Sequence, residues 1–155
     1  MRKHIPEILT DVNDAKSKAE RIRILQANNL RPLRTILALA FDKNIELDLP
    51  EGAPPFKRDE REPVGLSSAS LYTESRRLAR CAKGDPLPTR KKEMVYIQIL
   101  EGIHWTEADL VNKAKDKQLE DLYPNITREI VRKAFPTLLT DVQPNQFTKK
   151  EEDDE

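Results

Sequence analysis

The stretch LRPLRTILALAF, residues 30–41, contains the longest apolar run of the chain, Ile36 to Phe41. Its leucine, isoleucine, alanine and phenylalanine side chains would cover most of the circumference of a helix, a pattern typical of buried helices. Pro32 falls in the first turn of this helix, where its missing N–H costs little. Residues 30–41 are therefore predicted to form a helix at the centre of a hydrophobic core.

Further helices are expected on both sides of this one. Apolar residues recur at helical spacing in residues 14–27, 67–82, 90–101, a segment beginning at Thr106, and 128–135. A strand is an alternative for residues 90–101, because VYIQIL is rich in β-branched residues, but no partner strand lies nearby in the sequence. Four glycines and 5% aromatic residues also argue against an all-β chain. The predicted fold is all-α or nearly so, a single compact bundle of about five to six short helices.

Residues 42–66 interrupt the helical pattern. Residues 45–49 alternate like a short strand or extended segment, and six prolines and glycines follow before residue 66. We expect a long irregular Pro-rich loop within a helical domain of residues 1–139. Residues 140–155 form a polar tail that ends in five consecutive acidic residues, which repel one another and predict disorder. This tail would either aid solubility or occupy a basic surface.

Charge and cysteine content limit the class of protein. Because 27 basic residues balance 27 acidic ones, net charge neither predicts nor excludes nucleic-acid binding. Cys81 is the only cysteine, so it forms no internal disulfide or thiolate zinc site, and a packed core position is its simplest role. No secretory signal follows Met1, and the longest apolar run is far too short to cross a bilayer. A soluble cytoplasmic protein without membrane contact is expected.

No pattern in the chain predicts an enzyme. His4 and His104 are far apart in the sequence, and neither has a second histidine or cysteine at ligand spacing. No spacing pairs Cys81 or a serine with His104 as nucleophile and base. A phosphate-binding loop needs several glycines, whereas Gly52 and Gly84 stand alone beside acidic residues and prolines. We therefore expect a non-enzymatic protein with no metal and no cofactor.

The Pro-rich segment is the best candidate for a contact with a protein partner. Prolines reduce the entropy lost when an extended segment docks, and apolar residues at both ends would act as anchors. The predicted partner-binding residues are Leu49, Pro54, Pro55 and Phe56. An equally weighted alternative is that Leu49 and Phe56 only attach a long loop to the core.

Basic residues before and after residue 85 are a second candidate surface. Several of them recur at helical spacing and together would neutralise phosphates, with strongly salt-dependent binding. The candidates are Arg76, Arg77, Arg80, Arg90, Lys91 and Lys92. A solvated helix face is the favoured alternative, because charge-rich small proteins commonly have one and no aromatic platform adjoins these residues for base stacking.

Two segments resemble small proteins of T4-like tailed phages, cyanophages among them. The first is LRTILALAFDKNIELDLPEGAPPF, residues 33–56, which is similar to a helix followed by an LPEGxPP element. The second, YIQILEGIHWTEADLVNKAKDKQLEDLYPNITREIVRKAFPTLL, residues 96–139, is similar to their C-terminal half. The resemblance implies a phage protein acting in the cytoplasm of an infected bacterium, or a minor virion component. That family is uncharacterised, so the resemblance assigns no functional residues.

These observations predict an accessory protein that binds another macromolecule during infection. A protein partner, of phage or host origin, is favoured over the two alternatives. One alternative is a nucleic-acid-associated factor in replication, recombination or transcription. The other is a minor structural or assembly protein of the virion. The sequence fixes no oligomeric state.

Overall fold

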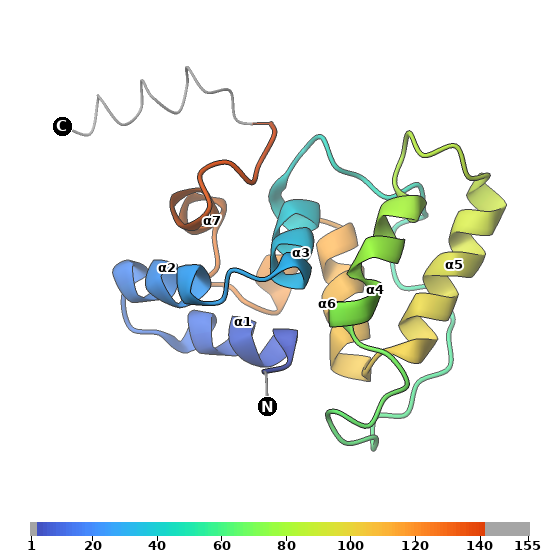
Figure 1. Cartoon of the computed structure of the whole chain (residues 1–155), viewed down its shortest axis with the longest axis horizontal. Coiled ribbons are helices and arrows are strands. Elements are labelled where there is room, and N and C mark those ends of the chain that lie inside the picture. Colours follow the sequence, from blue (N-terminus) through green and yellow to red (C-terminus); the bar gives the residue numbers. More distant parts are fainter. Residues whose placement is uncertain (1–2, 142–155) are drawn as a thin grey trace.

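The computed structural model describes residues 3–141 (Figure 1). Within them the chain forms seven α-helices, two short 3₁₀ helices and no strand. The elements are α1 (Ile5–Asp14), α2 (Lys18–Ala27), α3 (Arg31–Phe41), α4 (Leu71–Leu78), η1 (Ala79–Cys81), α5 (Thr89–Gly102), α6 (Trp105–Lys115), η2 (Leu119–Asp121) and α7 (Arg128–Ala134). The prediction of a compact helical domain is confirmed, with slightly more helices than expected.

α3 lies at the centre, as its composition predicts. α1, α2 and α7 lie on one side of it and α4 and α5 on the other, while α6 packs directly against it (Figure 1). Leu33, Ile36 and Leu37 are fully buried in one hydrophobic core that receives side chains from every α-helix. Removal of this apolar surface from water is the main force that holds the bundle together.

α1 is a helix that the sequence patterns did not predict. Its fully buried side chains recur every three or four residues: Ile5, Ile8, Leu9 and Val12. Pro6 is tolerated because it lies in the first turn. The helix expected from residue 14 starts later, because the chain is extended at Ala15 and Ser17 accepts a hydrogen bond from the Glu20 N–H at 3.2 Å. This serine is the N-cap of α2.

Other helix starts differ from the expected ones by a few residues. The strand alternative for residues 90–101 is wrong, because this segment lies within α5. α4 begins after Ser70, which forms a capping box with Thr73, rather than after residues 67 and 68. The N-cap of α6 is His104 and not Thr106, because the His104 Nδ1 atom accepts the Thr106 N–H.

The loop between α3 and α4 spans residues 42–70 and is attached to the helices along its first part. The Asp48 N–H donates to the Cys81 carbonyl oxygen at 2.8 Å, and the Lys83 N–H donates to the Glu46 carbonyl oxygen at 2.9 Å. Within residues 3–141 this region forms only one isolated β-bridge, between Leu47 and Ala82, so residues 45–49 belong to no sheet. The predicted long irregular loop is confirmed.

Lys117 closes the beginning of this loop. Its ammonium donates to three backbone carbonyl oxygens, those of Leu39, Asp42 and Ile45. Burial lowers the pKa of this amine from its ordinary value, while nearby carboxylates of Glu46 and Asp42 oppose that shift. One lysine thereby supplies donors to carbonyl groups in the last turn of α3, at its C-cap and in the loop that follows.

The described chain ends beside the same region. Asp42 accepts hydrogen bonds from the Thr140 N–H at 2.8 Å and from its hydroxyl at 2.7 Å, and Arg128 donates to Asp141 at 2.7 Å. The predicted disorder of the acidic end, Glu151 to Glu155, lies outside the described residues. No helix among residues 3–141 has the length and apolar character needed to cross a membrane.

Candidate functional site

The Pro-rich loop and α5 enclose a groove of about 410 Å³, here called the loop groove. Three of the four predicted partner-binding residues line it: Leu49, Pro54 and Pro55. The rest of its wall comes from Pro50, Glu51, Gly52, Ala53, Glu93, Tyr96, Ile97 and Lys115. A concave, mostly apolar surface with a few polar groups is the usual form of a binding site.

Lys115 of α6 holds the loop in this shape. Its ammonium donates to the carbonyl oxygens of Pro50 at 2.8 Å and Gly52 at 3.0 Å, and it pairs with Asp116 at 2.6 Å. Asp116 in turn accepts the Gly52 N–H at 3.0 Å. Gly52 has a φ of +90°, a conformation that side-chain-bearing residues rarely adopt. The loop is therefore organised before any partner arrives, which reduces the entropy cost of binding.

Tyr96 forms the floor of the loop groove and is almost completely buried. Its hydroxyl donates to the Oδ1 atom of Asn112 at 2.6 Å. Burial raises the pKa of this hydroxyl well above its ordinary value, so Tyr96 stays neutral. The Nδ2 atom of Asn112 is buried and finds no hydrogen-bond partner within residues 3–141. The floor is thus fixed by one hydrogen bond and carries an unused donor beside it.

Phe56, the fourth predicted partner-binding residue, lies elsewhere. It is half-buried, packs against the core, and does not line the loop groove. The Arg58 guanidinium lies 5.9 Å from the centre of its ring and 5.3 Å from that of Trp105. Such cation–π contacts hold this part of the loop on α6. Phe56 therefore attaches the loop to the core. Leu49 also packs against the core, and it borders the groove together with Pro54 and Pro55.

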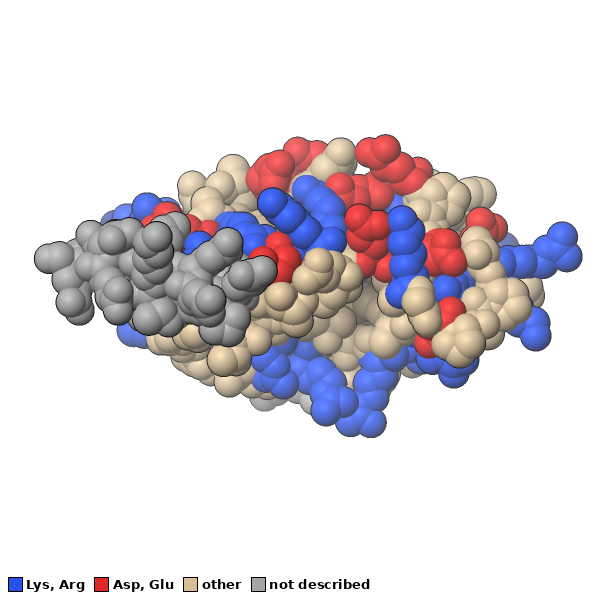
Figure 2. Space-filling model, turned by 90° about the horizontal axis from the view of Figure 1, so that it is seen from above, with Lys and Arg blue, Asp and Glu red and all other residues tan. Residues whose placement is uncertain are grey.

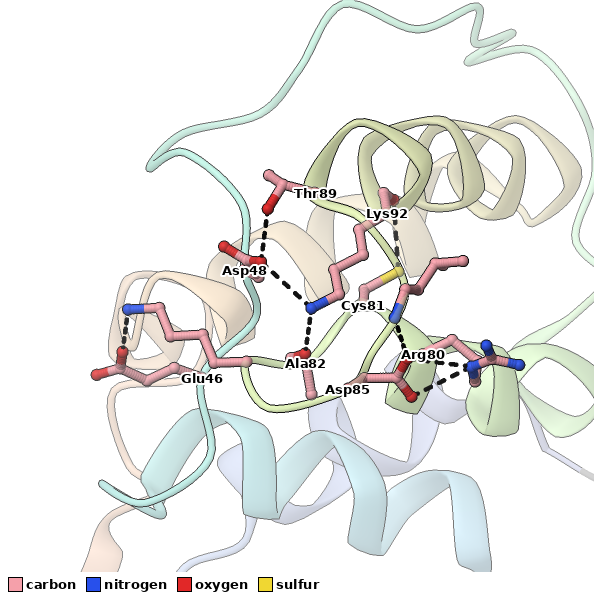
Figure 3. Close-up of polar contacts among 10 residues, drawn as sticks. Glu46, Asp48, Arg80, Cys81, Ala82, Asp85, Thr89 and Lys92 are labelled. Carbon is pink, nitrogen blue, oxygen red and sulfur yellow. Dashed lines mark hydrogen bonds and ion pairs between the residues drawn. The ribbon is translucent and has the colours of Figure 1, made fainter.

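The predicted basic surface is smaller than its sequence suggests. Arg77 pairs with Glu74 at 3.2 Å, and Arg80 pairs with Asp85 at 3.2 Å, as the dashed lines for Arg80 show in Figure 3. Lys92 is buried, so the expectation that it faces phosphates is corrected. The remaining three candidates, Arg76, Arg90 and Lys91, are exposed and make no ion pair with residues 3–141.

Lys92 instead joins three segments of the fold (Figure 3). Its ammonium donates to Asp48 of the loop at 3.2 Å and to the Ala82 carbonyl oxygen at 2.9 Å. The Thr89 hydroxyl donates to the same oxygen of Asp48 at 2.8 Å. Thr89, with a smaller contribution from Lys92, holds the pKa of the Asp48 carboxyl below its ordinary value. This cluster attaches the loop to the first turn of α5.

Cys81 has the packed role that its sequence context predicts. It is fully buried, and its thiol lies 3.6 Å from the Lys92 carbonyl oxygen. Burial raises the pKa of the thiol to about 11. Because the thiolate is the nucleophile, such a cysteine is chemically inert at neutral pH.

The two histidines are close together in the fold, which their separation in the sequence does not suggest. The rings of His4 and His104 lie 5.4 Å apart, and the fully buried Glu107 carboxylate lies 3.2 Å from His4 Nε2. Both ring nitrogens of His104 are engaged, Nδ1 with Thr106 and Nε2 with the Glu62 carbonyl oxygen at 2.7 Å. His104 therefore holds the loop, and it has no free nitrogen to act as a base.

His4 lines a second groove, of about 450 Å³, beside Trp105 and Tyr123. Sequence reasoning did not identify Glu107, which in the sequence is only an acidic residue in the first turn of α6. Its partners are distant in the sequence: His4, and the Leu71 N–H, which donates to its carboxylate at 3.1 Å. Within residues 3–141, no three His, Cys, Asp or Glu side chains are placed so that they could hold a metal ion.

A family model for DUF6433, a family of unknown function, matches residues 8–121. The chain belongs to DUF6433. The matched residues run from α1 to η2, so the DUF6433 segment contains the entire loop groove and the Lys92 cluster, whereas α7 lies beyond it. No curated protein and no solved structure gives a significant match to the chain.

Proposed function

We propose that this DUF6433 chain is a non-enzymatic accessory protein of a T4-like tailed phage that binds a protein partner in the cytoplasm of the infected bacterium. The observation that carries the proposal is the preorganised loop groove. Leu49, Pro54 and Pro55 border it, and two residues of α5 supply its floor, Tyr96, and an apolar wall, Ile97. The phage and the cytoplasm rest on the resemblance of residues 33–56 and 96–139 to small phage proteins.

The chemistry of the groove favours an extended apolar segment as the bound part of the partner. Its lining contains three prolines, one glycine and one alanine. It also has two exposed carboxylates, Glu51 in the loop and Glu93 on α5. Prolines present a fixed apolar surface at little entropy cost. Lys115 is largely neutralised by Asp116 and two carbonyl oxygens, so the groove offers shape and apolar area rather than a strong charge.

Site-specific photo-crosslinking in infected cells tests the proposal. A photoreactive amino acid at Pro55, which is exposed and borders the groove, is expected to form a covalent adduct with one protein. The same amino acid at exposed Thr137, outside the groove, is the matched control. An adduct that survives nuclease supports a protein partner. Equal adducts at both positions, or an adduct that nuclease removes, would contradict it.

A binding measurement with the purified, crosslinked partner then tests the groove itself. Ile97→Glu places a carboxylate in the apolar wall and is expected to weaken binding by about tenfold or more, because a charge would be buried without a partner. Gln98→Glu adds the same charge to the same helix at an exposed position outside the groove. Equal affinity of these two variants would remove the loop groove from the interface.

A nucleic-acid role remains the principal rival, and a virion role is the other. Arg76, Arg90 and Lys91 are the exposed cations that would contact phosphates. A gel shift at two salt concentrations separates the first rival, since phosphate neutralisation predicts a steep loss of affinity as salt rises. Detection of the protein in purified particles by mass spectrometry would support the virion role.

A further inference from the structure

A third groove, of about 560 Å³, lies between α3 and α4 and is here called the arginine groove. Three arginines line it: Arg31 and Arg34 of α3 and Arg76 of α4. Most of the other lining residues are apolar, among them Ala38, Leu39, Leu78, Ala79 and Ala82. The groove thus combines an apolar floor with three cations and has no acidic lining residue.

Two of these arginines have no carboxylate partner among the described residues. Arg31 and Arg76 are exposed and form no ion pair with any residue from 3 to 141. Arg34 donates to Asn29, which is uncharged. The next arginines on α4 and η1 are different, because Arg77 and Arg80 already have carboxylate partners. Figure 2 shows that lysine and arginine side chains gather along one edge of the molecule, the lower edge in that view.

We propose that the arginine groove binds an acidic peptide segment of a partner protein, one that carries a large apolar side chain between Asp and Glu residues. Guanidinium groups pair with carboxylates in a bidentate geometry, which fits the three arginines. Small side chains line the groove at Ala38, Ala79 and Ala82, which leaves room for an apolar side chain of the peptide between the cations. This site shares no lining residue with the loop groove.

The floor distinguishes a peptide from a nucleic acid. A phosphate backbone would pair with the arginines but would leave the apolar floor in contact with water. No aromatic side chain lines the groove, so bases have no platform on which to stack. A peptide with both acidic and apolar side chains satisfies the cations and covers the floor at once.

Fluorescence anisotropy with synthetic peptides and the full chain tests this site. The probe is a fluorescein-labelled peptide EDELFEDE, and its competitors are the neutral peptide QNQLFQNQ, the anchor-free peptide EDEGGEDE and a duplex DNA. The probe is expected to bind at least about tenfold more tightly than each competitor, with affinity that falls as salt rises. Equal binding of EDEGGEDE, or tighter binding of DNA, would overturn the assignment.

Variants locate the binding. Arg31→Glu with Arg76→Glu reverses two groove charges and is expected to reduce probe affinity by about tenfold or more. Arg90→Glu with Lys91→Glu changes the net charge equally at exposed residues outside the groove and is expected to preserve binding. Ala79→Trp fills the groove from an exposed position and should also abolish binding. All three variants must retain the helical circular dichroism of the wild type, and equal affinity of the two charge variants contradicts the proposal.

The chain's own acidic end is the alternative occupant, and one further variant separates it from a partner. The probe is added to the full chain and to a chain lacking Glu151 to Glu155. Equal affinities support a groove open to a partner. If only the shortened chain binds the probe, the groove serves the chain's own end, and the assignment to a partner is wrong.

Discussion

The ammonium of Lys92 lies 3.2 Å from the Oδ2 atom of Asp48, although only 3% of the lysine side chain is exposed. A buried cation is costly unless it is paired and hydrogen-bonded, and here the second acceptor is the Ala82 carbonyl oxygen. The contact joins the loop to α5 across 44 residues of sequence. A residue that resembles part of a basic surface is therefore a structural link.

Lys92→Met tests this link. The substitution keeps most of the side-chain volume but leaves the Ala82 carbonyl oxygen without its donor and Asp48 with the Thr89 hydroxyl alone, so we expect a loss of about 1–3 kcal/mol in the free energy of unfolding. This loss of unfolding free energy is smaller than that expected for a fully buried ion pair, because 34% of the Asp48 side chain is exposed and can be hydrated. Urea denaturation measures it, and exposed Lys91→Met, expected within about 0.5 kcal/mol of wild type, is the control.

The acid dependence of the Asp48 contact follows from the direction of its pKa shift. Its carboxyl has a lowered pKa in the folded chain, so its stabilisation is present above the ordinary value of about 3.9 and disappears as pH falls through the lower folded value. Asp48→Asn is therefore expected to be less stable than wild type at pH 6 and equally stable well below pH 4. A difference that persists unchanged in acid would contradict this explanation.

The Cys81 thiol is expected to resist modification in the folded chain. Burial raises its pKa from 9.0 to about 11, so a thiol reagent at pH 8 should react only after unfolding. The stability that accompanies the raised pKa is present below pH 9 and is lost as pH rises towards 11. Urea denaturation of wild type and Cys81→Ala isolates the contribution of the thiol to the pH dependence of stability, because the other groups titrate equally in both proteins. Identical pH slopes between 9 and 11 would refute it.

The Tyr96–Asn112 hydrogen bond is expected to stabilise the floor of the loop groove. Tyr96→Phe leaves the buried Asn112 oxygen unpaired and should cost about 1–2 kcal/mol of unfolding free energy. Adding Asn112→Leu removes the other partner, so the double variant should be more stable than the sum of the two single variants predicts. Additive losses in a double-mutant cycle would show that these side chains do not interact.

His104 is expected to protect the loop from proteolysis. His104→Asn retains a residue suited to capping α6 but cannot reach the Glu62 carbonyl oxygen, whereas His104→Ala loses both contacts. Trypsin cleavage after the highly exposed Arg61 should therefore accelerate in both variants, while only His104→Ala should also lose about 1 kcal/mol from the missing cap. Unchanged cleavage rates would mean that His104 does not restrain the loop.

Most helices of this chain were predictable because their signals are local. The apolar spacing of residues 31–41 specifies a buried helix without reference to any other segment, and the prolines of the loop exclude regular structure there. The apolar spacing of α1 is regular, but Pro6 and the short length make its local signal weak, and packing against α2 and α6 stabilises it. The hydrogen bond from the Glu20 N–H to the Ser17 side chain is also a local feature, and it marks the start of α2.

The sequence identified which residues are candidates for binding, but not which of them the fold exposes, buries or places in a groove. Leu49, Pro54 and Pro55 border a groove, whereas Phe56, one residue further, does not line it, although both Leu49 and Phe56 pack against the core. Arg76 remains exposed, whereas Lys92 is buried. These outcomes depend on which partner each side chain meets, and sequence spacing holds no information about partners tens of residues away.

The amino-acid sequence alone determined that this chain forms short helices around one core and that residues 42–66 form an irregular loop. Helical periodicity and proline geometry act between neighbours along the chain, so they need no tertiary information. Only the tertiary structure decided that Lys92 is buried, that His4 and Glu107 meet, and that unpaired arginines of α3 and α4 share one groove. Charges and hydrogen bonds between distant segments acquire their energies only when folding excludes water and brings those segments together.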